Sequence, residues 1–204
     1  MEFYELHPVT PQIRFINKAV EVLENGGVII YPTDTIYGIG CDIFNKQALE
    51  RVYDIKHEAG TKLFSFICPD LKDIARYAKV SDYAYKAMKK LLPGPYTFVL
   101  PAAREVPKKL WTKRNTVGIR IPDHPVALTL ARELGHPIVS TSVTSRLGEV
   151  LYDPAEIKAI FNYQVDLMLS VGALNGHPSS IVDLSGDEPE IIREGAGDVT
   201  VFKS

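Results

Sequence analysis

The sequence has few cysteines and no long apolar run. Two cysteines, Cys41 and Cys68, occur among 204 residues. Two are too few for a disulfide framework, and neither has a partner at metal-ligand spacing, so both are expected to be buried apolar side chains. No stretch approaches the roughly 18 apolar residues of a membrane span, and the start MEFYELHPVT lacks the pattern of a secretory signal. These absences predict a cytoplasmic protein with no membrane partner.

The usual motifs of nucleotide and metal chemistry are also missing. The chain contains no GxGxxG, GxxxxGK[ST], HExxH or GxSxG, so a nucleotide site must be built in another way, and no metal site is expected. Four histidines adjoin proline and are interpreted as surface turn residues: His7, His124, His136 and His177. His57, beside Lys56, is the remaining candidate for chemistry.

The charge is small overall but unevenly distributed. The formal net charge is -2, yet residues 150–204 hold nine acids and three bases, a net charge of -6, which leaves +4 for residues 1–149. Part of this excess of positive charge lies in the segment KKLWTKRNTVGIR, which contains Lys108, Lys109, Lys113, Arg114 and Arg120. Such a cluster is either a solvated face or a surface that follows a phosphate backbone.

Strand and helix patterns alternate along the chain. Helices are predicted after Thr10-Pro11, Asn45, Asp70, Ser81, Asp123-His124 and Asp153, where capping residues precede apolar residues at helical spacing. Strands are predicted at VIIY, LFSFIC, YTFVL, NTVGIRI, PIVSTS, DLMLSV, SSIVDL and EIIRE. No repeat of 20 to 50 residues and no linker divides the chain. The pattern therefore predicts one α/β domain with a mixed sheet.

Polar residues follow two of the predicted strands. In YPTDTIYGIG a buried strand ends at Thr33, Asp34, Thr35 and Tyr37, and in PIVSTSVTS another ends in a run of hydroxyl groups, residues 140 to 145. Each segment is either an internally satisfied turn or the floor of a ligand site, because ligands of open α/β sheets collect at strand ends. Compact hydroxyl groups and exposed amides suit an anion.

Two arginines alternate with apolar residues in predicted strands. Arg120 lies between Ile119 and Ile121, and Arg193 lies in EIIREG. A guanidinium is costly in such a position unless it faces a cleft or a carboxylate. Arg193 could pair with Glu194 or another acid, but two arginines of this kind together favour a polar cavity.

Several motifs, in order, resemble the YrdC-like family, and most closely its YciO branch. They are PTDTIYGIG, a helix ending in lysine, LLPGPYTFVLPA, NTVGIRIPDHPVA, PIVSTS, PSSIVDL and REGAGDV, and they extend over roughly residues 10 to 200. The resemblance implies a single domain over residues 1–204. Its fold would be a twisted open mixed sheet with flanking helices around a large, positively lined concave surface.

The resemblance also implies an activity. Family members act as nucleotidyltransferases that make threonylcarbamoyl-adenylate from threonine, bicarbonate and ATP, a step in the threonylcarbamoyladenosine modification of tRNA. ATP would be a substrate, used with magnesium, and no tightly bound cofactor is implied. The alternative is a protein that binds double-stranded RNA or tRNA on the concave basic surface without efficient catalysis.

Site residues follow from the resemblance position by position. The implied catalytic residues are Lys56 and Arg120. The implied substrate-binding residues are Thr33, Thr35, Tyr37, Ser142 and Thr144. The implied nucleotide-binding residues are Lys62, Ser140, Ser180 and Arg193. The basic candidates for RNA binding are Lys108, Lys109, Lys113 and Arg114.

The chain departs from two signatures of the family's synthases. The first signature is a lysine and an arginine separated by one residue, and this chain has Lys56-His57-Glu58 there. The second is a serine and an asparagine separated by one residue, and this chain has Ser142-Val143-Thr144 there. If Glu58 occupies the place of the arginine, a two-unit change of charge beside a phosphate weakens ATP binding strongly, since one unit at about 4 Å is worth on the order of 4 kcal/mol. Lys62 would compensate in part if its loop folds inward.

Overall fold

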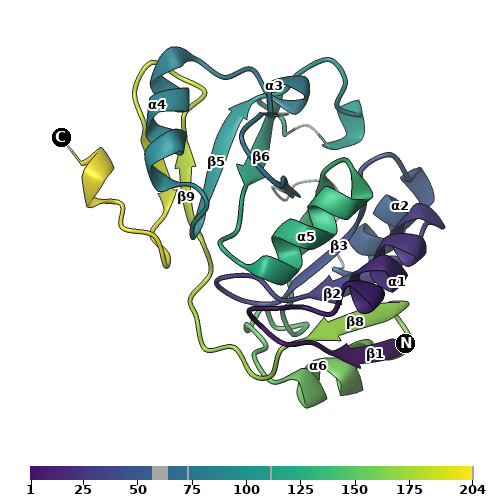
Figure 1. Cartoon of the computed structure of the whole chain (residues 1–204). Helices are drawn as coiled ribbons and strands as arrows, with labels where there is room; N and C mark the ends of the chain where they lie inside the picture. Colours follow the sequence, from purple (N-terminus) through teal and green to yellow (C-terminus); the bar gives the residue numbers. More distant parts are fainter. Residues whose placement is uncertain (57–63, 73, 111, 204) are drawn as a thin grey trace.

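A computed structural model of the chain describes residues 1–56, 64–72, 74–110 and 112–203 (Figure 1). In this part of the chain the strands form one ten-stranded sheet in the order β1-β8-β2-β3-β7-β4-β6-β5-β9-β10. Four neighbouring pairs are parallel and five are antiparallel. The predicted α/β fold with a twisted, open, mixed sheet is therefore confirmed.

The strands are short, and most were predicted. They are β1 (Glu2–Glu5), β2 (Val28–Tyr31), β3 (Gly38–Asp42), β4 (Ser65–Ile67), β5 (Tyr96–Pro101), β6 (Thr116–Arg120), β7 (Ile138–Ser142), β8 (Leu167–Ser170), β9 (Ser180–Asp183) and β10 (Glu190–Arg193). The sequence did not predict β1 or β3. β1 is an edge strand with a glutamate at each end, and β3 (GIGCD) contains two glycines, which are poor strand formers.

Glycine is required in β3 because its neighbours approach closely. A Cβ atom on Gly40 would lie 2.7 Å from the backbone oxygen of Val139 and 2.8 Å from Cγ2 of Ile138, both in β7. On Gly38 it would lie 3.0 Å from Oγ of Ser140. The two glycines of the YPTDTIYGIG segment thus allow β3 to pack tightly against β7.

The helices begin near the predicted capping residues. They are α1 (Ile13–Glu24), α2 (Lys46–Ile55), α3 (Ile74–Tyr77), α4 (Asp82–Leu91), α5 (Pro125–Leu134) and α6 (Pro154–Phe161), with short 3-10 turns at Lys108–Leu110 and Thr200–Phe202. The side chains of Asn45, Ser81 and Asp153 accept hydrogen bonds from amides in the first turns of α2, α4 and α6. For α1 the prediction was wrong: the helix begins at Ile13, and Gln12, not Thr10, occupies the N-cap position.

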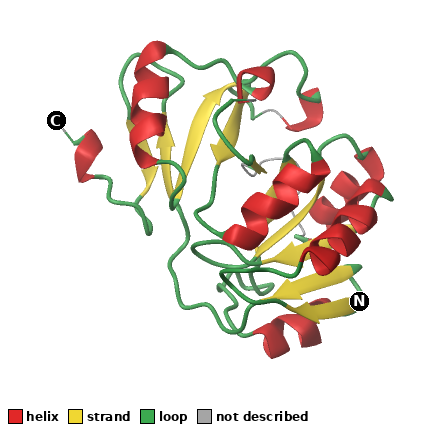
Figure 2. Cartoon of the chain, in the orientation of Figure 1, coloured by secondary structure: helices red, strands yellow, loops and turns green. Residues whose placement is uncertain are grey.

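The helices cover the sheet from both sides (Figure 2). Helices α1 and α5 pack against β2, β7 and β8 through a cluster that includes Ile16, Leu23, Tyr31, Leu130 and Ile138. On the opposite face, α2, α4 and α6 contribute to a larger cluster that also contains residues from β4, β5 and β6. Neither cysteine forms a disulfide, and both are buried, as predicted. No helix in the described ranges is long and apolar enough to cross a membrane.

Candidate functional site

The register of the sheet brings polar residues from several strands to one face. Ser65 of β4 lies opposite Ser140 of β7 and Gly118 of β6, and Ile67 lies opposite Arg120. Because alternate side chains of a strand point to the same face, Ser65, Ser140 and Arg120 share the face on which α1 and α5 pack. A cavity of about 50 Å³ opens there, and Thr33, Tyr37, Thr97, Ser142, Ser179 and Arg193 also line it.

Arg120 is held in the cavity wall by the segment that follows β2. Its Nη2 atom donates to Oδ1 of Asp34 and Oγ1 of Thr35, both at 2.6 Å, and to Oγ1 of Thr33 at 3.2 Å. The Arg120 and Asp34 side chains are each only 10% exposed. Within the described residues no group accepts from Nε or Nη1 of Arg120. Nε, which is buried, and Nη1 therefore have no acceptor among the described residues, and Asp34 neutralises part of the charge of the guanidinium.

Arg193 contributes a second positive charge. Its Nε and Nη2 atoms donate to the backbone oxygen of Ser179 at 3.0 and 2.7 Å. Burial, and secondarily the charge of Arg120, lower the pKa of Arg193. The alternative in which Glu194 neutralises Arg193 is wrong, because Glu194 pairs with Lys203 at 2.5 Å. In the described part of the chain, Arg193 has no carboxylate partner.

The segment from Pro32 to Tyr37 is both a satisfied turn and a wall of the cavity. Oγ1 of Thr33 donates to the backbone oxygen of Ile36 at 2.7 Å and accepts from the amides of Thr35 and Ile36. The hydroxyl of Tyr37 donates to the backbone oxygen of Gly172 at 2.6 Å, and burial raises the pKa of Tyr37. The two interpretations left open for this segment are thus compatible.

Lys56 connects the end of α2 to the end of β7. Its ammonium donates to the backbone oxygen of Ser142 at 3.0 Å and to the hydroxyl of Thr144. Since Ser142 lines the cavity, the positive charge of Lys56 lies directly behind this wall. Ser140 is buried, and its hydroxyl accepts from the phenol of Tyr31 at 2.7 Å. The hydroxyl-rich segment of residues 140 to 145 therefore contacts Lys56 and also lines the cavity that contains Arg120.

Ser180 is placed differently from the other candidates. Its side chain is fully buried, donates to the backbone oxygen of Gly197 at 2.6 Å and accepts from the amide of Gly195 at 2.9 Å. It stabilises the C-terminal segment instead of lining the cavity. The preceding residue, Ser179, lines the cavity and is hydrogen bonded to Thr97 at 2.9 Å.

The basic candidates for RNA binding lie away from the cavity. Lys108 and Lys109 lie in the turn at 108–110, and Lys113 and Arg114 precede β6. Thr116, at this end of β6, is four residues of about 3.3 Å each away from Arg120, which is the last residue of the strand. Arg114 pairs with Glu190 at 3.6 Å on the surface. Lys62, His57 and Glu58 lie outside the described residues.

The interpretation of His124 as a surface turn residue is wrong. This side chain is only 9% exposed, and its Nδ1 atom accepts from the amide of Val126 at 3.2 Å, so it caps α5. Burial lowers the pKa of His124, partly offset by Asp34 and Asp123.

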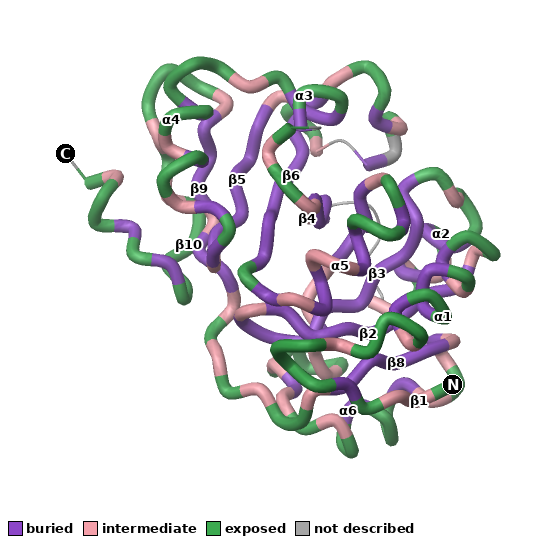
Figure 3. The backbone as a smooth tube through the Cα atoms, viewed as in Figure 1, coloured by how far each residue is buried: buried purple, intermediate pink, exposed green. Residues whose placement is uncertain are grey.

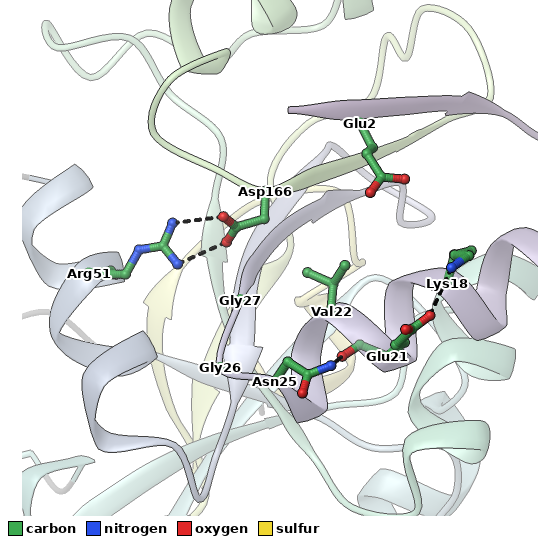
Figure 4. A pocket seen from close by; sticks show the side chains of 9 residues that line it. All are labelled: Glu2, Lys18, Glu21, Val22, Asn25, Gly26, Gly27, Arg51 and Asp166. Atoms are coloured by element: carbon green, nitrogen blue, oxygen red, sulfur yellow. Dashed lines mark hydrogen bonds and ion pairs between the residues drawn. The ribbon is translucent and has the colours of Figure 1, made fainter.

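A larger cavity, of about 320 Å³, lies beside α1 and α2 (Figure 4). Its two cationic side chains each point toward an acidic one. Arg51 binds both carboxylate oxygens of Asp166, at 2.8 and 3.2 Å, and Lys18 pairs with Glu21 at 2.9 Å. Because both cations are neutralised in these pairs and Glu2 adds a further negative charge, the smaller cavity with its two arginines is the better candidate site for an anion. The described residues include no group of three or more histidine, cysteine, aspartate or glutamate side chains that could hold a metal ion.

Sequence reasoning missed part of the cavity wall. Ser65, Thr97 and Ser179 were not candidates, although each adds a hydroxyl group to the lining. The sequence pattern indicates Asp34 only as part of its polar segment. The strand pairing that brings these residues together joins segments distant in sequence, and only the alternation of polar and apolar residues in LFSFIC and YTFVL hinted at a polar face.

Comparison with known proteins agrees with this fold. A family model described as Telomere recombination, Sua5/YciO/YrdC, matches residues 21–195. YciO of Escherichia coli is 42% identical over 203 residues, which is 98% of each chain. Its crystal structure has a TM-score of 0.95 and covers 99% of this chain and 100% of that one.

Two more distant relatives extend the comparison. A threonylcarbamoyl-AMP synthase of Coxiella burnetii is 32% identical over 157 residues, 76% of this chain and 83% of the relative. The crystal structure of P. abyssi Sua5 complexed with L-threonine shares the fold, with a TM-score of 0.89, 23% identity, and coverage of 96% of this chain and 58% of that one. From the matched family model and the extent of these similarities, this chain belongs to the Sua5/YciO/YrdC family.

Proposed function

We propose that this protein is a threonylcarbamoyl-AMP synthase that uses threonine, bicarbonate and ATP. The observation that carries the proposal is the pair of arginines in one hydroxyl-lined cavity, with no acceptor on Nη1 of Arg120 and no carboxylate on Arg193 within the described residues. The relatives named as synthases support the same activity.

The reaction requires binding and orientation more than a protein nucleophile. The amine of threonine loses a proton and forms a carbamate with bicarbonate, which releases water. A carbamate oxygen then attacks the α-phosphorus of ATP, and pyrophosphate leaves. Negative charge is present throughout, so preorganised cations and hydrogen-bond donors lower the barrier.

Roles for individual residues follow from their positions. Arg120 and Arg193 would hold the carboxylate and phosphate oxygens, and the hydroxyls of Thr33 and Ser142 would orient the substrate. Lys56 would fix the end of β7 through Ser142 and Thr144 and add positive charge behind the site. ATP would enter with magnesium.

The proposal is tested by product formation. Purified protein with threonine, labelled bicarbonate, ATP and magnesium should yield threonylcarbamoyl-AMP and pyrophosphate, detected by mass spectrometry. Arg193→Ala should lower kcat/KM at least about 100-fold, since a charged hydrogen bond to the reacting anion is worth roughly 3 kcal/mol. Arg104→Ala, an exposed arginine outside the cavity, serves as the matched control. No product at high protein concentration would refute the proposal.

A second experiment tests the departures from the synthase signatures. Replacing Glu58 with arginine and Thr144 with asparagine restores both signatures. The double variant should form the product faster, because it replaces a negative charge by a positive one at the signature position and supplies an amide where Lys56 now bonds a hydroxyl. An unchanged rate would show that neither departure limits the reaction.

A further inference from the structure

One part of the molecule carries most of the positive charge. Residues 70–114 contain eleven lysines and arginines and four aspartates and glutamates, a net charge of +7, so the remaining residues carry -9 of the total of -2. Figure 1 shows the elements of this segment, α3, α4 and β5, together at the top of the view, away from α1, α6 and the N-terminus. A charge separation of this size attracts polyanions to one end of the protein.

The outer surface of α4 combines tyrosine and lysine side chains. Tyr83 is 45% exposed and Tyr85 is 47% exposed, although large aromatic side chains are usually more buried. At helical spacing, Tyr83 is followed by Lys86 and Lys90, and Tyr85 by Lys89, so each ring lies beside at least one ammonium group. Figure 3 shows this side of α4 as exposed, while Ala84 and Met88 anchor the helix in the core.

The lysines on this helix keep their charge available. Among the ion pairs of the described residues, none involves Lys86, Lys89 or Lys90. The pairs that do involve this segment, Arg76 with Glu105 and Arg114 with Glu190, are both 3.6 Å long and exposed. With three lysines and one aspartate, Asp82, helix α4 thus has a net positive surface.

This surface extends toward the basic stretch before β6. The amide of Lys79 bonds the backbone oxygen of Pro101 at 2.8 Å, and the amide of Ala103 bonds that of Tyr77 at 3.0 Å. These bonds place the start of α4 beside the segment that leads to Lys108 and Lys113. The α4 surface is also separate from the cavity, because Met88 packs on the sheet face opposite to that of Arg120.

The chemistry of the surface identifies the partner. A membrane surface would be rich in exposed aliphatic side chains, but in the described residues of 70–114, which do not include Trp111, the exposed large hydrophobic side chains are the two tyrosines. An acidic protein would use the lysines and leave the rings unused. Bases stack on exposed rings while phosphates bind adjacent lysines. We propose that the outer surface of α4 binds single-stranded nucleic acid, an interaction that is independent of the proposed adenylation reaction.

The proposal is tested by fluorescence anisotropy with the full chain. The probes are a labelled single-stranded RNA of about 20 nucleotides and a duplex of the same length, titrated from about 50 to 300 mM KCl. The single strand should bind more tightly than the duplex. Tyr83→Ala with Tyr85→Ala should weaken binding at least about fivefold and leave the salt dependence unchanged, because stacking is not ionic. Lys86→Ala with Lys90→Ala should reduce the slope of log K against log salt by roughly 1.4.

Matched controls lie in the acidic part of the molecule. Tyr163, 97% exposed, and Lys46, also exposed, are replaced with alanine, and these variants should bind RNA as the unmodified protein does. Thermal melting verifies that every variant is folded. The proposal is overturned if neither RNA binds at low salt, if the control variants lose as much affinity as the α4 variants, or if the duplex binds best and the tyrosine variants bind it unchanged. Equal affinity for polyglutamate and RNA would also overturn it, in favour of an acidic protein partner.

Discussion

The buried ion pair between Asp34 and Arg120 should contribute more to stability than any exposed pair of the protein. Both side chains are only 10% exposed, and the two atoms that meet are 2.6 Å apart. Replacing Asp34 with alanine leaves the Arg120 charge buried with only the hydroxyls of Thr33 and Thr35 as partners. Removing one member of a buried pair costs about 3 to 5 kcal/mol. We expect about 3 kcal/mol, since two hydroxyl acceptors remain.

The measurement is the free energy of unfolding from urea denaturation at pH 7. Glu194→Ala is the matched control, because it removes an exposed pair with Lys203, whose side chains are 51% and 63% exposed. Exposed pairs contribute about 0 to 1 kcal/mol, so this variant should remain close to the unmodified protein. If Asp34→Ala and Glu194→Ala lower the free energy of unfolding equally, burial does not give the Asp34 pair its strength and our reasoning is wrong.

The same pair limits the affinity of the cavity for anions. Asp34→Asn keeps an acceptor for Arg120 and removes one negative charge near the ligand. At an effective dielectric of 20, a unit charge about 6 Å away is worth on the order of 3 kcal/mol, so pyrophosphate should bind at least about tenfold more tightly to the folded variant. Isothermal titration calorimetry measures this change. Weaker binding would show that Asp34 serves the site by orienting Arg120, and that its charge is secondary.

Three further predictions concern single residues. Because burial holds the pKa of His124 below its ordinary value of 6.5, the unfolded chain takes up its proton first, and stability should fall as the pH decreases below about 6.5. His124→Asn, which keeps a capping side chain, should show a smaller fall in the urea midpoint between pH 7 and 5.5. Gly40→Ala should destabilise the protein by about 1 to 3 kcal/mol, since its Cβ atom meets backbone of β7, whereas Gly186→Ala, with its nearest neighbour 3.8 Å away, should be almost neutral in thermal melting. Asp166→Ala should cost about 1 to 2 kcal/mol in the same measurement, because it removes bonds to Arg51 and to the amide of Val28.

Features that depend on neighbouring residues were predictable from the sequence. Asn45, Ser81 and Asp153 cap their helices as expected, because a capping side chain bonds amides two or three residues later. Gly135, with a φ of 77°, ends α5 at the predicted place. Lys56 was predicted at the end of the core-facing stripe of α2, and it lies there at the C-cap.

Features that depend on strand pairing were harder to predict. In SSIVDL the sequence does not show which serine faces the cavity, since a shift of one residue reverses the direction of every side chain. Pairing of Thr97 with Ile181 fixes the register and turns Ser179, not Ser180, toward the cavity. The partner of Arg193 was equally hidden, because Ser179 is 14 residues away in sequence and offers a backbone oxygen.

The charges of the cavity determine which ligands it can hold by itself. Arg120 and Arg193 contribute two positive charges, and Asp34 removes one. A single carboxylate or carbamate balances this remainder, whereas ATP carries about four negative charges. Most of the triphosphate charge must therefore be balanced by magnesium, by Lys56 behind the β7 wall, or by solvent. It follows that threonine and its carbamate should depend on the two arginines more strongly than the distal phosphates do, and that mutation of Arg120 or Arg193 should raise the KM for threonine more than that for ATP.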